Sequence, residues 1–158
     1  MAITSSINQN GRATTVKKTF SRETSVSIEI NAAPSIIWAL LTTASDYPRW
    51  NSTIISIDGK IAPGEKIKLK SALDPKRTFK LAVKEFGPES KLVWGDAMGK
   101  RVYGLTKNSN GGTLFSMAEK IGGPIFPLFA KMIPSFDASF EQFAADLKKE
   151  AESIMNTK

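Results

Sequence analysis

The region between Thr53 and Lys120 consists of short runs of alternating apolar and polar residues, each of which ends in a turn sequence. The turns are Asp58-Gly59, Asp74-Pro75, Gly87-Pro88 and Asn110-Gly111-Gly112. Turn residues that recur about every ten positions are typical of consecutive antiparallel hairpins, not of strands joined by helices. We therefore predict a meander of six strands, over residues 53–57, 66–71, 77–86, 92–94, 101–107 and 113–120.

One further strand and a short helix precede this meander. Residues 23–30 alternate strictly, with Val26 and Ile28 on the same face, which is the period of a half-buried strand. Pro34 is suited to the first position of a helix. The helix has to end before Pro48, because a residue that precedes proline disfavours the helical conformation.

The sequence after Gly122-Gly123-Pro124 changes to a helical period, and Ser135 is a predicted N-cap. The apolar stripe comprises Phe129, Met132 or Ile133, Phe136, Phe140, Phe143, Leu147 and Ile154. A sheet with one solvated face needs a cover for its other face, and this stripe is the only long apolar one. We predict an α+β fold in which a curved antiparallel sheet of seven strands wraps around a long C-terminal helix and encloses an apolar pocket.

The chain of 158 residues is expected to form one domain. Residues 1–20 are rich in Ser, Thr, Asn and Gln, which predicts a flexible N-terminal tail and places the domain at residues 21–158. No stretch approaches the run of about 18 apolar residues that a membrane span requires. The first residues also lack the apolar core of a secretory signal, so we expect a cytoplasmic protein without a transmembrane segment.

The net charge of +7 is unevenly distributed. Four basic residues precede the first acidic residue, Glu23, and without them the balance is 18 basic against 15 acidic residues, or +3. Part of the remaining excess recurs at alternate positions, at Lys66, Lys68, Lys70, Lys80 and Lys84. This alternation indicates the solvated face of a sheet. No arginine-rich run or zinc-finger spacing accompanies it, so no nucleic-acid partner is predicted.

The sequence contains neither Cys nor His. Their absence excludes disulfides, thiol nucleophiles, imidazole bases and the commonest zinc ligands. Any chemistry must therefore depend on carboxylates, Lys, Tyr, Ser or Thr. We predict no metal site and no cofactor.

Several short motifs carry a resemblance to a known superfamily. They are Ile30-Asn-Ala-Ala-Pro34, Ile37-Trp38-Ala-Leu-Leu41, Asp46-Tyr47-Pro48-Arg49-Trp50-Asn51, the Gly59 and Gly64 pair, Gly112-Thr113 and Phe143-Ala-Ala-Asp-Leu147-Lys148. In order and spacing, over about residues 23–152, they resemble the polyketide cyclase/dehydrase-like branch of the START-like (SRPBCC, Bet v 1-like) superfamily. The resemblance implies the helix-grip fold, with a cavity between the sheet and the long helix. Function stays open, because this superfamily includes lipid carriers, hormone receptors and aromatase/cyclases.

Side chains expected to face this cavity are the predicted ligand-binding residues. They are Trp50, Phe79, Trp94, Tyr103, Phe115, Met117, Phe129, Met132, Phe136 and Phe140. Ligand pockets are lined mainly by apolar and aromatic side chains, but so is a packed core, and both interpretations stay open for residues 129–140. Residues 122–129 combine Gly-Gly-Pro with aromatic residues, which suits a gate over the pocket, a lip that touches a membrane, or a plug of the core.

Tyr103, Glu119 and Asp96 are the candidates for acid–base chemistry. A carboxylate that is partly desolvated at the edge of an apolar cavity can act as a general acid or base, with Tyr103 as a hydrogen-bond donor. The alternative is that these acids are solvated or paired with a basic neighbour such as Arg101 or Lys120.

Three functions are compatible with these patterns. The favoured one is binding or transport of a small hydrophobic ligand, such as a lipid or a polyketide. The second is a cyclase, aromatase or dehydratase that uses the tyrosine and the carboxylates named above. The third is a basic interaction module for an acidic partner or an anionic membrane surface. The sequence does not predict the oligomeric state.

Overall fold

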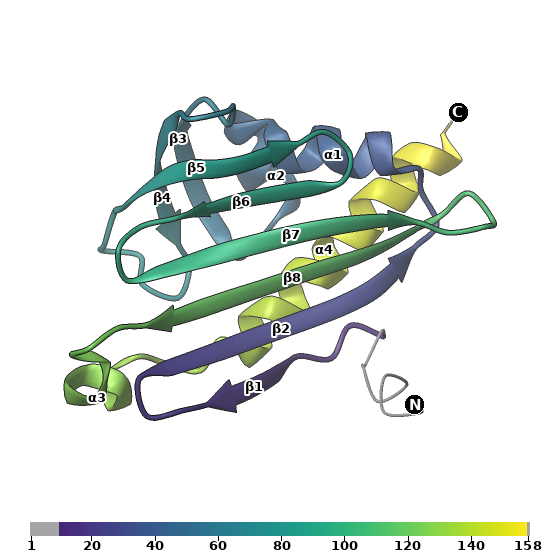
Figure 1. Cartoon of the computed structure of the whole chain (residues 1–158). Coiled ribbons are helices and arrows are strands. Elements are labelled where there is room, and N and C mark those ends of the chain that lie inside the picture. Colours follow the sequence, from purple (N-terminus) through teal and green to yellow (C-terminus); the bar gives the residue numbers. More distant parts are fainter. Residues whose placement is uncertain (1–9, 158) are drawn as a thin grey trace.

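The computed structural model describes residues 10–157, and in it one antiparallel sheet curves around a long C-terminal helix (Figure 1). The elements are β1 (Thr14–Lys17), β2 (Ser21–Ile30), α1 (Pro34–Thr42), η2 (Ala44–Asp46), α2 (Tyr47–Trp50), β3 (Ile54–Gly59), β4 (Lys66–Ser71), β5 (Phe79–Gly87), β6 (Lys91–Gly95), β7 (Gly99–Lys107), β8 (Thr113–Gly122), α3 (Phe126–Phe129), η3 (Ala130–Met132) and α4 (Asp137–Asn156). The strands lie in the order β1-β2-β8-β7-β6-β5-β4-β3. The predicted α+β helix-grip fold is confirmed.

The six-stranded meander is confirmed as β3 to β8, and the strand predicted over residues 23–30 is confirmed as β2. The sheet has eight strands, however, and not seven. The additional strand is β1, within the stretch that the sequence assigned to the tail, and it pairs with β2 so that Thr15 lies opposite Thr24. An edge strand can be held by its hydrogen-bond ladder alone, without the buried apolar face that marks a strand in a sequence. Residues 1–9 of the expected tail lie outside the described residues.

The turn after β3 depends on Gly59. Its φ of +107° lies in a region that favours glycine, and a Cβ there would lie 2.8 Å from the carbonyl oxygen of Lys66. This glycine lets the chain turn tightly from β3 toward β4.

The two faces of the sheet differ as predicted. Lys66, Lys68, Lys70, Lys80 and Lys84 are all exposed. The opposite face packs against α4, whose buried residues include Phe140, Phe143 and Leu147. The alternating lysines therefore mark the solvated face of the sheet, and the C-terminal stripe marks its cover.

The centre of the core is an aromatic cluster around Phe143. Its ring stacks on that of Phe115 at a centroid distance of 6.2 Å and lies 5.7 Å from Tyr103, 5.9 Å from Trp50 and 6.4 Å from Tyr47. These contacts join α4 to β7, β8 and α2. The space between the sheet and the middle of the helix is therefore filled.

Polar contacts hold α4 at its start and in its second half. Near its start, the Asp137 backbone N–H donates to Ser135 Oγ (3.2 Å), but the N-cap position belongs to Phe136, one residue later than predicted. Farther along, Arg49 donates to Glu150 at 2.8 Å.

None of the helices formed by residues 10–157 has both the length and the apolar character needed to cross a membrane.

Candidate functional site

A cavity of about 280 Å³ lies between the inner face of the sheet and the segment that leads into α4. Strands β4 to β8 contribute Leu69, Phe79, Leu81, Trp94, Arg101, Glu119 and Ile121. Residues 129–136 contribute Phe129, Met132, Ile133, Pro134 and Phe136. The cavity thus occupies one end of the fold, next to the first turn of α4.

The strand period determines which side chains reach this cavity. Arg101 and Tyr103 are two residues apart on β7, and Glu119 on β8 lies directly opposite Arg101 in the register. The faces that bear Tyr103 and Phe115 point inward, as expected, and both residues are almost completely buried. Arg101 and Glu119 continue that inner face to the cavity, where Phe140 in the first turn of α4 packs against Arg101.

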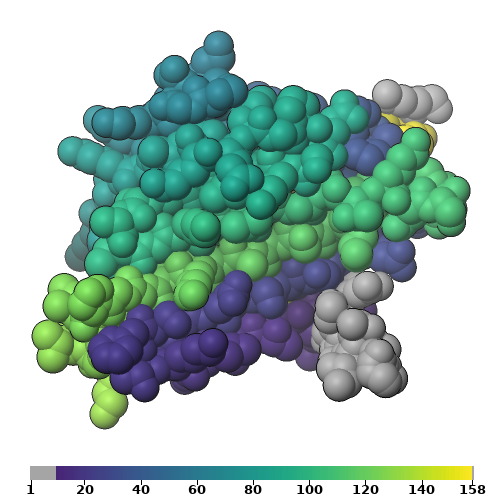
Figure 2. All heavy atoms as spheres, in the orientation of Figure 1, coloured from purple at the N-terminus to yellow at the C-terminus, as the bar shows by residue number. Residues whose placement is uncertain are grey.

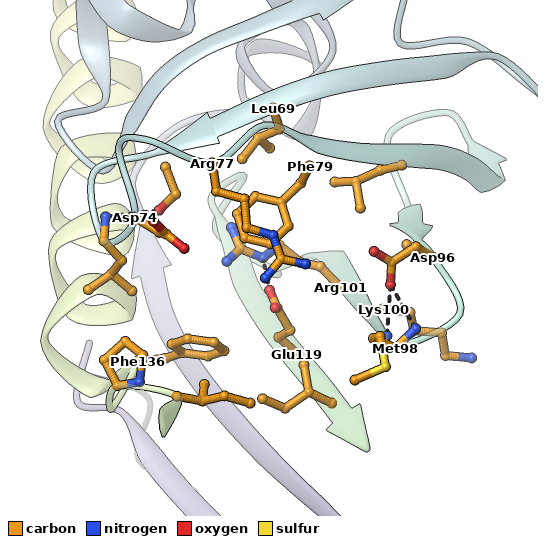
Figure 3. A pocket seen from close by; sticks show the side chains of 18 of the residues that line it. Leu69, Asp74, Arg77, Phe79, Asp96, Met98, Lys100, Arg101, Glu119 and Phe136 are labelled. Atoms are coloured by element: carbon orange, nitrogen blue, oxygen red, sulfur yellow. Dashed lines mark hydrogen bonds and ion pairs between the residues drawn. The ribbon is translucent and has the colours of Figure 1, made fainter. Parts of the chain in front are cut away.

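Arg101 and Glu119 form an ion pair on the cavity floor. The Nε of Arg101 donates to Oε1 of Glu119 at 2.7 Å, and the two side chains are 17% and 21% exposed. Figure 3 shows these side chains directed toward one another, with Phe79 on one side and Phe136 on the other. Both charges are largely removed from water. Loss of either residue would therefore leave the other charge buried without a compensating partner.

The Arg101 guanidinium makes further contacts. It lies over the ring of Phe140, 5.0 Å from the centroid, and its NH1 donates to the hydroxyl of Tyr103 at 3.3 Å. Desolvation lowers the pKa of Arg101, but Glu119 and Tyr103 raise it, and the net direction is upward. Burial raises the pKa of Tyr103, although Arg101 opposes the shift. At neutral pH the cavity wall therefore carries the Arg101 guanidinium, and the protonated phenol of Tyr103 lies behind it in the core.

Five of the predicted ligand-binding residues line the cavity, and two of the predicted acid–base residues also reach it. The ligand-binding residues are Phe79, Trp94, Phe129, Met132 and Phe136, and the acids are Asp96 and Glu119. They come from β5, β6, β8, the turn before β7 and the segment before α4. The fold thus gathers residues from positions 79 to 136 around one space.

The other predicted site residues lie in the packed core and do not line the cavity. They are Trp50, Tyr103, Phe115, Met117 and Phe140, each at most 7% exposed. Trp50 was expected to face the cavity but packs 5.0 Å from Tyr47 and 5.9 Å from Phe143 of α4. Phe140 is covered by Phe136, whose ring stacks on it at 6.1 Å.

Asp96 has a structural role in the turn between β6 and β7. Its Oδ1 accepts hydrogen bonds from the backbone N–H groups of Met98 (2.9 Å) and Gly99 (3.0 Å) (Figure 3). Glu119 is paired with Arg101, so the expected alternative of a basic partner is confirmed for this acid. Both carboxylates are therefore engaged within the protein.

Sequence reasoning missed two arginines on the cavity wall. Arg101 was expected only to pair with nearby acids, and no role was expected for Arg77, whose guanidinium lies 4.4 Å from the centre of the Phe79 ring. The alternation of Arg101 with Tyr103 placed this cation on the inner face and was the signal that could have found it. Among residues 10–157, no three acidic side chains gather into a group that could hold a metal ion.

Comparison with known proteins identifies the fold. No family model and no curated protein matches the chain. Among solved structures, a START superfamily protein from Mycobacterium smegmatis superposes with a TM-score of 0.61 at 16% identity, over 84% of this chain and 98% of that one. A conserved protein of unknown function from Enterococcus faecalis gives a TM-score of 0.64 at 15% identity, over 89% and 77% of the two chains.

A third similar structure is the di-domain ARO/CYC protein BexL from the BE-7585A biosynthetic pathway. It gives a TM-score of 0.65 at 11% identity and covers 86% of this chain but 52% of its own. The present chain thus corresponds to about half of that protein. These likenesses establish the START-like, Bet v 1-like fold, and at such identities they establish the fold alone.

Proposed function

We propose that this protein binds a compact, largely apolar small molecule in the cavity between β4–β8 and residues 129–136. The observation that carries the proposal is the cavity itself, because most of its wall is apolar or aromatic. The polar residues on the wall are Ser71, Asp74, Arg77, Asp96, Lys100, Arg101 and Glu119. This combination is typical of small-molecule sites. The START-like fold also supports a ligand-binding role.

The size of the cavity restricts the ligand. Its volume of about 280 Å³ is slightly below the roughly 300–1,000 Å³ that is usual for ligand pockets. Phe79, Trp94 and Phe136 supply aromatic rings from different sides of the cavity. We expect a ligand with one or two fused or linked rings, or a short branched chain, and not a long acyl chain enclosed along its whole length.

The polar groups support binding more directly than acid–base catalysis. Glu119 is neutralised by Arg101, Asp96 accepts hydrogen bonds within its own turn, and Tyr103 lies behind Arg101 in the core. A general base needs access to the proton that it removes. Arg101 and Glu119 can instead orient a polar substituent of the ligand.

The cytoplasmic location of the protein stays a prediction.

Filling the cavity is expected to abolish most ligand uptake. Leu81→Trp places a larger side chain on the cavity wall, and we expect at least a tenfold loss of affinity for the neutral fluorescent probe N-phenyl-1-naphthylamine. The matched control is Leu114→Trp. Leu114 is also half-buried on a strand, but it lies on the face of β8 opposite to Phe115 and therefore points away from the cavity. Probe fluorescence measured as a titration distinguishes the two variants.

Absence of probe uptake by the unmodified protein would contradict the proposal, and so would equal affinities of the two tryptophan variants. Native mass spectrometry of the protein purified from its own host is the second measurement. We expect a bound species below the mass of a phospholipid, because the cavity cannot enclose one. The same species should be depleted in Leu81→Trp and retained in Leu114→Trp.

A further inference from the structure

An exposed apolar surface lies at one corner of the molecule, next to the cavity and sharing one residue, Met132, with its wall. We call it the apolar corner, and it consists of Phe20, Ile125, Leu128 and Met132, which are 57%, 57%, 82% and 80% exposed. Large apolar side chains gathered in this way on a surface are characteristic of interaction sites.

The apolar corner combines two parts of the chain that are distant in sequence. Phe20 occupies the turn between β1 and β2, whereas the other three residues belong to the segment around α3 and η3. The two parts are tied together, since Gly123 N–H donates to the Phe20 carbonyl at 3.0 Å. Figure 2 shows the β1–β2 turn and the α3 segment side by side at the lower left corner of the molecule.

Basic residues surround this corner. A hollow of about 420 Å³ lies between the β1–β2 hairpin and the segment 126–137, and its lining includes Lys17, Lys18, Arg22 and Lys131. Asp137 is the one acidic residue on that lining, and it accepts a hydrogen bond from the Thr15 hydroxyl. Residues 12–22 and 120–136 contain no acidic residue at all. The corner is therefore apolar at its tip and positively charged around it.

The buried member of this basic group is incompletely paired. Arg22 is 7% exposed, and its terminal nitrogens donate to the carbonyl oxygens of Ile133 (3.2 Å) and Pro134 (2.7 Å). Its Nε is buried without a hydrogen-bond partner. The guanidinium fixes the segment before α4 and adds a buried positive charge behind the lysines.

We propose that the apolar corner docks onto a membrane surface that contains anionic phospholipids. The four apolar side chains would enter the boundary between headgroups and acyl chains, and Lys17, Lys18 and Lys131 would contact lipid phosphates. Apolar insertion combined with attraction of lysines to anionic lipids is the pattern of reversible membrane binding.

Charge complementarity favours a lipid surface over a second copy of this chain. A symmetric contact through the same corner would bring Lys17, Lys18 and Lys131 of one copy against those of the other. Like charges that meet at an interface oppose association. An anionic bilayer offers an apolar layer for the exposed apolar side chains and negative charge for the lysines around them.

Docking at this corner would place the cavity next to the bilayer. Ile133 lines both the cavity and the basic hollow, and Met132 belongs to both the cavity wall and the apolar corner. The segment that would touch the membrane is therefore a wall of the proposed ligand site. The docking itself does not require a bound ligand.

Flotation with vesicles tests this proposal. We expect the full chain to float with phosphatidylcholine/phosphatidylglycerol vesicles (7:3) at 100 mM NaCl, at least tenfold more than with phosphatidylcholine alone, and to dissociate at 500 mM NaCl. Lys17→Gln/Lys18→Gln/Lys131→Gln should weaken partitioning about fivefold per lysine removed. The matched control, Lys66→Gln/Lys68→Gln/Lys70→Gln, removes the same charge from the solvated sheet face and should retain binding.

The apolar contribution is tested separately. Ile125→Ser/Leu128→Ser should reduce flotation at least fivefold, and neither residue lines the cavity, so uptake of the fluorescent probe should be unchanged. The matched control is Ile55→Ser/Met155→Ser, at residues 42% and 41% exposed elsewhere on the surface. Circular dichroism verifies that each variant is folded.

Three results would overturn the proposal. The first is equal flotation with neutral and anionic vesicles, or none with either. The second is an equal loss in both lysine variants, which would indicate net charge and not this corner. The third is binding to immobilised polyglutamate by a protein that does not float with vesicles, if the Ile125→Ser/Leu128→Ser variant binds polyglutamate equally well. That result would indicate an acidic protein as the partner.

Discussion

Phe143→Ala is expected to lower the free energy of unfolding by about 4 kcal/mol, the usual cost of truncating a fully buried phenylalanine. Phe143 is 1% exposed and has aromatic neighbours on several sides, including Phe115 and Tyr103. These neighbours belong to strands that cannot collapse into the space left behind. Since domains are stable by only about 5–15 kcal/mol, this single change should remove a large part of the total.

Urea denaturation followed by circular dichroism measures this effect. The matched control is Phe20→Ala, because Phe20 is 57% exposed and should change the free energy of unfolding by less than about 0.5 kcal/mol. A loss below about 1 kcal/mol for Phe143→Ala would show that α4 does not pack on the sheet as described.

The fold was predictable because its signals are periodic and local. Alternation in the strands, turn residues between them and a helical stripe after residue 124 each indicate one element. The need to cover one sheet face then places the helix. The edge strand β1 escaped prediction for the opposite reason, since it buries little and is held mainly by backbone pairing to β2.

The candidate site was predictable only in part, because periodicity shows which side chains face inward but not where packing ends. Phe136 and Phe140 occupy the same stripe, yet Phe136 lines the cavity and Phe140 lies beneath it. The difference arises because Phe136 belongs to the segment that precedes α4 and lines the cavity, whereas Phe140 lies within α4, which begins at Asp137. No local pattern specifies this difference.

Trp50 illustrates the same limit from the opposite direction. The sequence predicted that Trp50 faces the cavity, but α2 places it against Tyr47 and Phe143 in the aromatic cluster at the centre of the core. Its position depends on how the short helix α2 packs on the core. This is a tertiary contact, and the spacing of residues in the sequence does not predict it. The position of a residue in the sequence therefore could not show whether its side chain lies in the packed core or on the cavity wall.

Arg101→Met is expected to destabilise the protein by about 3 kcal/mol. Removing one member of a largely buried ion pair leaves the other charge without compensation, and such losses are typically about 3–5 kcal/mol. Here Glu119 would remain on the cavity floor without its partner, and the Tyr103 hydroxyl would lose a donor. We place the expected value at the lower limit because both side chains keep some contact with solvent.

The double variant Arg101→Met/Glu119→Leu separates this explanation from a simple loss of packing. Replacing both charges with apolar side chains of similar size removes the uncompensated carboxylate, so most of the stability should return, with a coupling of about 2 kcal/mol in the double-mutant cycle. The control is Lys91→Met, which breaks the exposed pair between Lys91 and Glu85 and should cost at most about 1 kcal/mol. If Arg101→Met costs no more than Lys91→Met, the cavity floor is solvated. Its polar groups would then be too weakly held to orient a ligand.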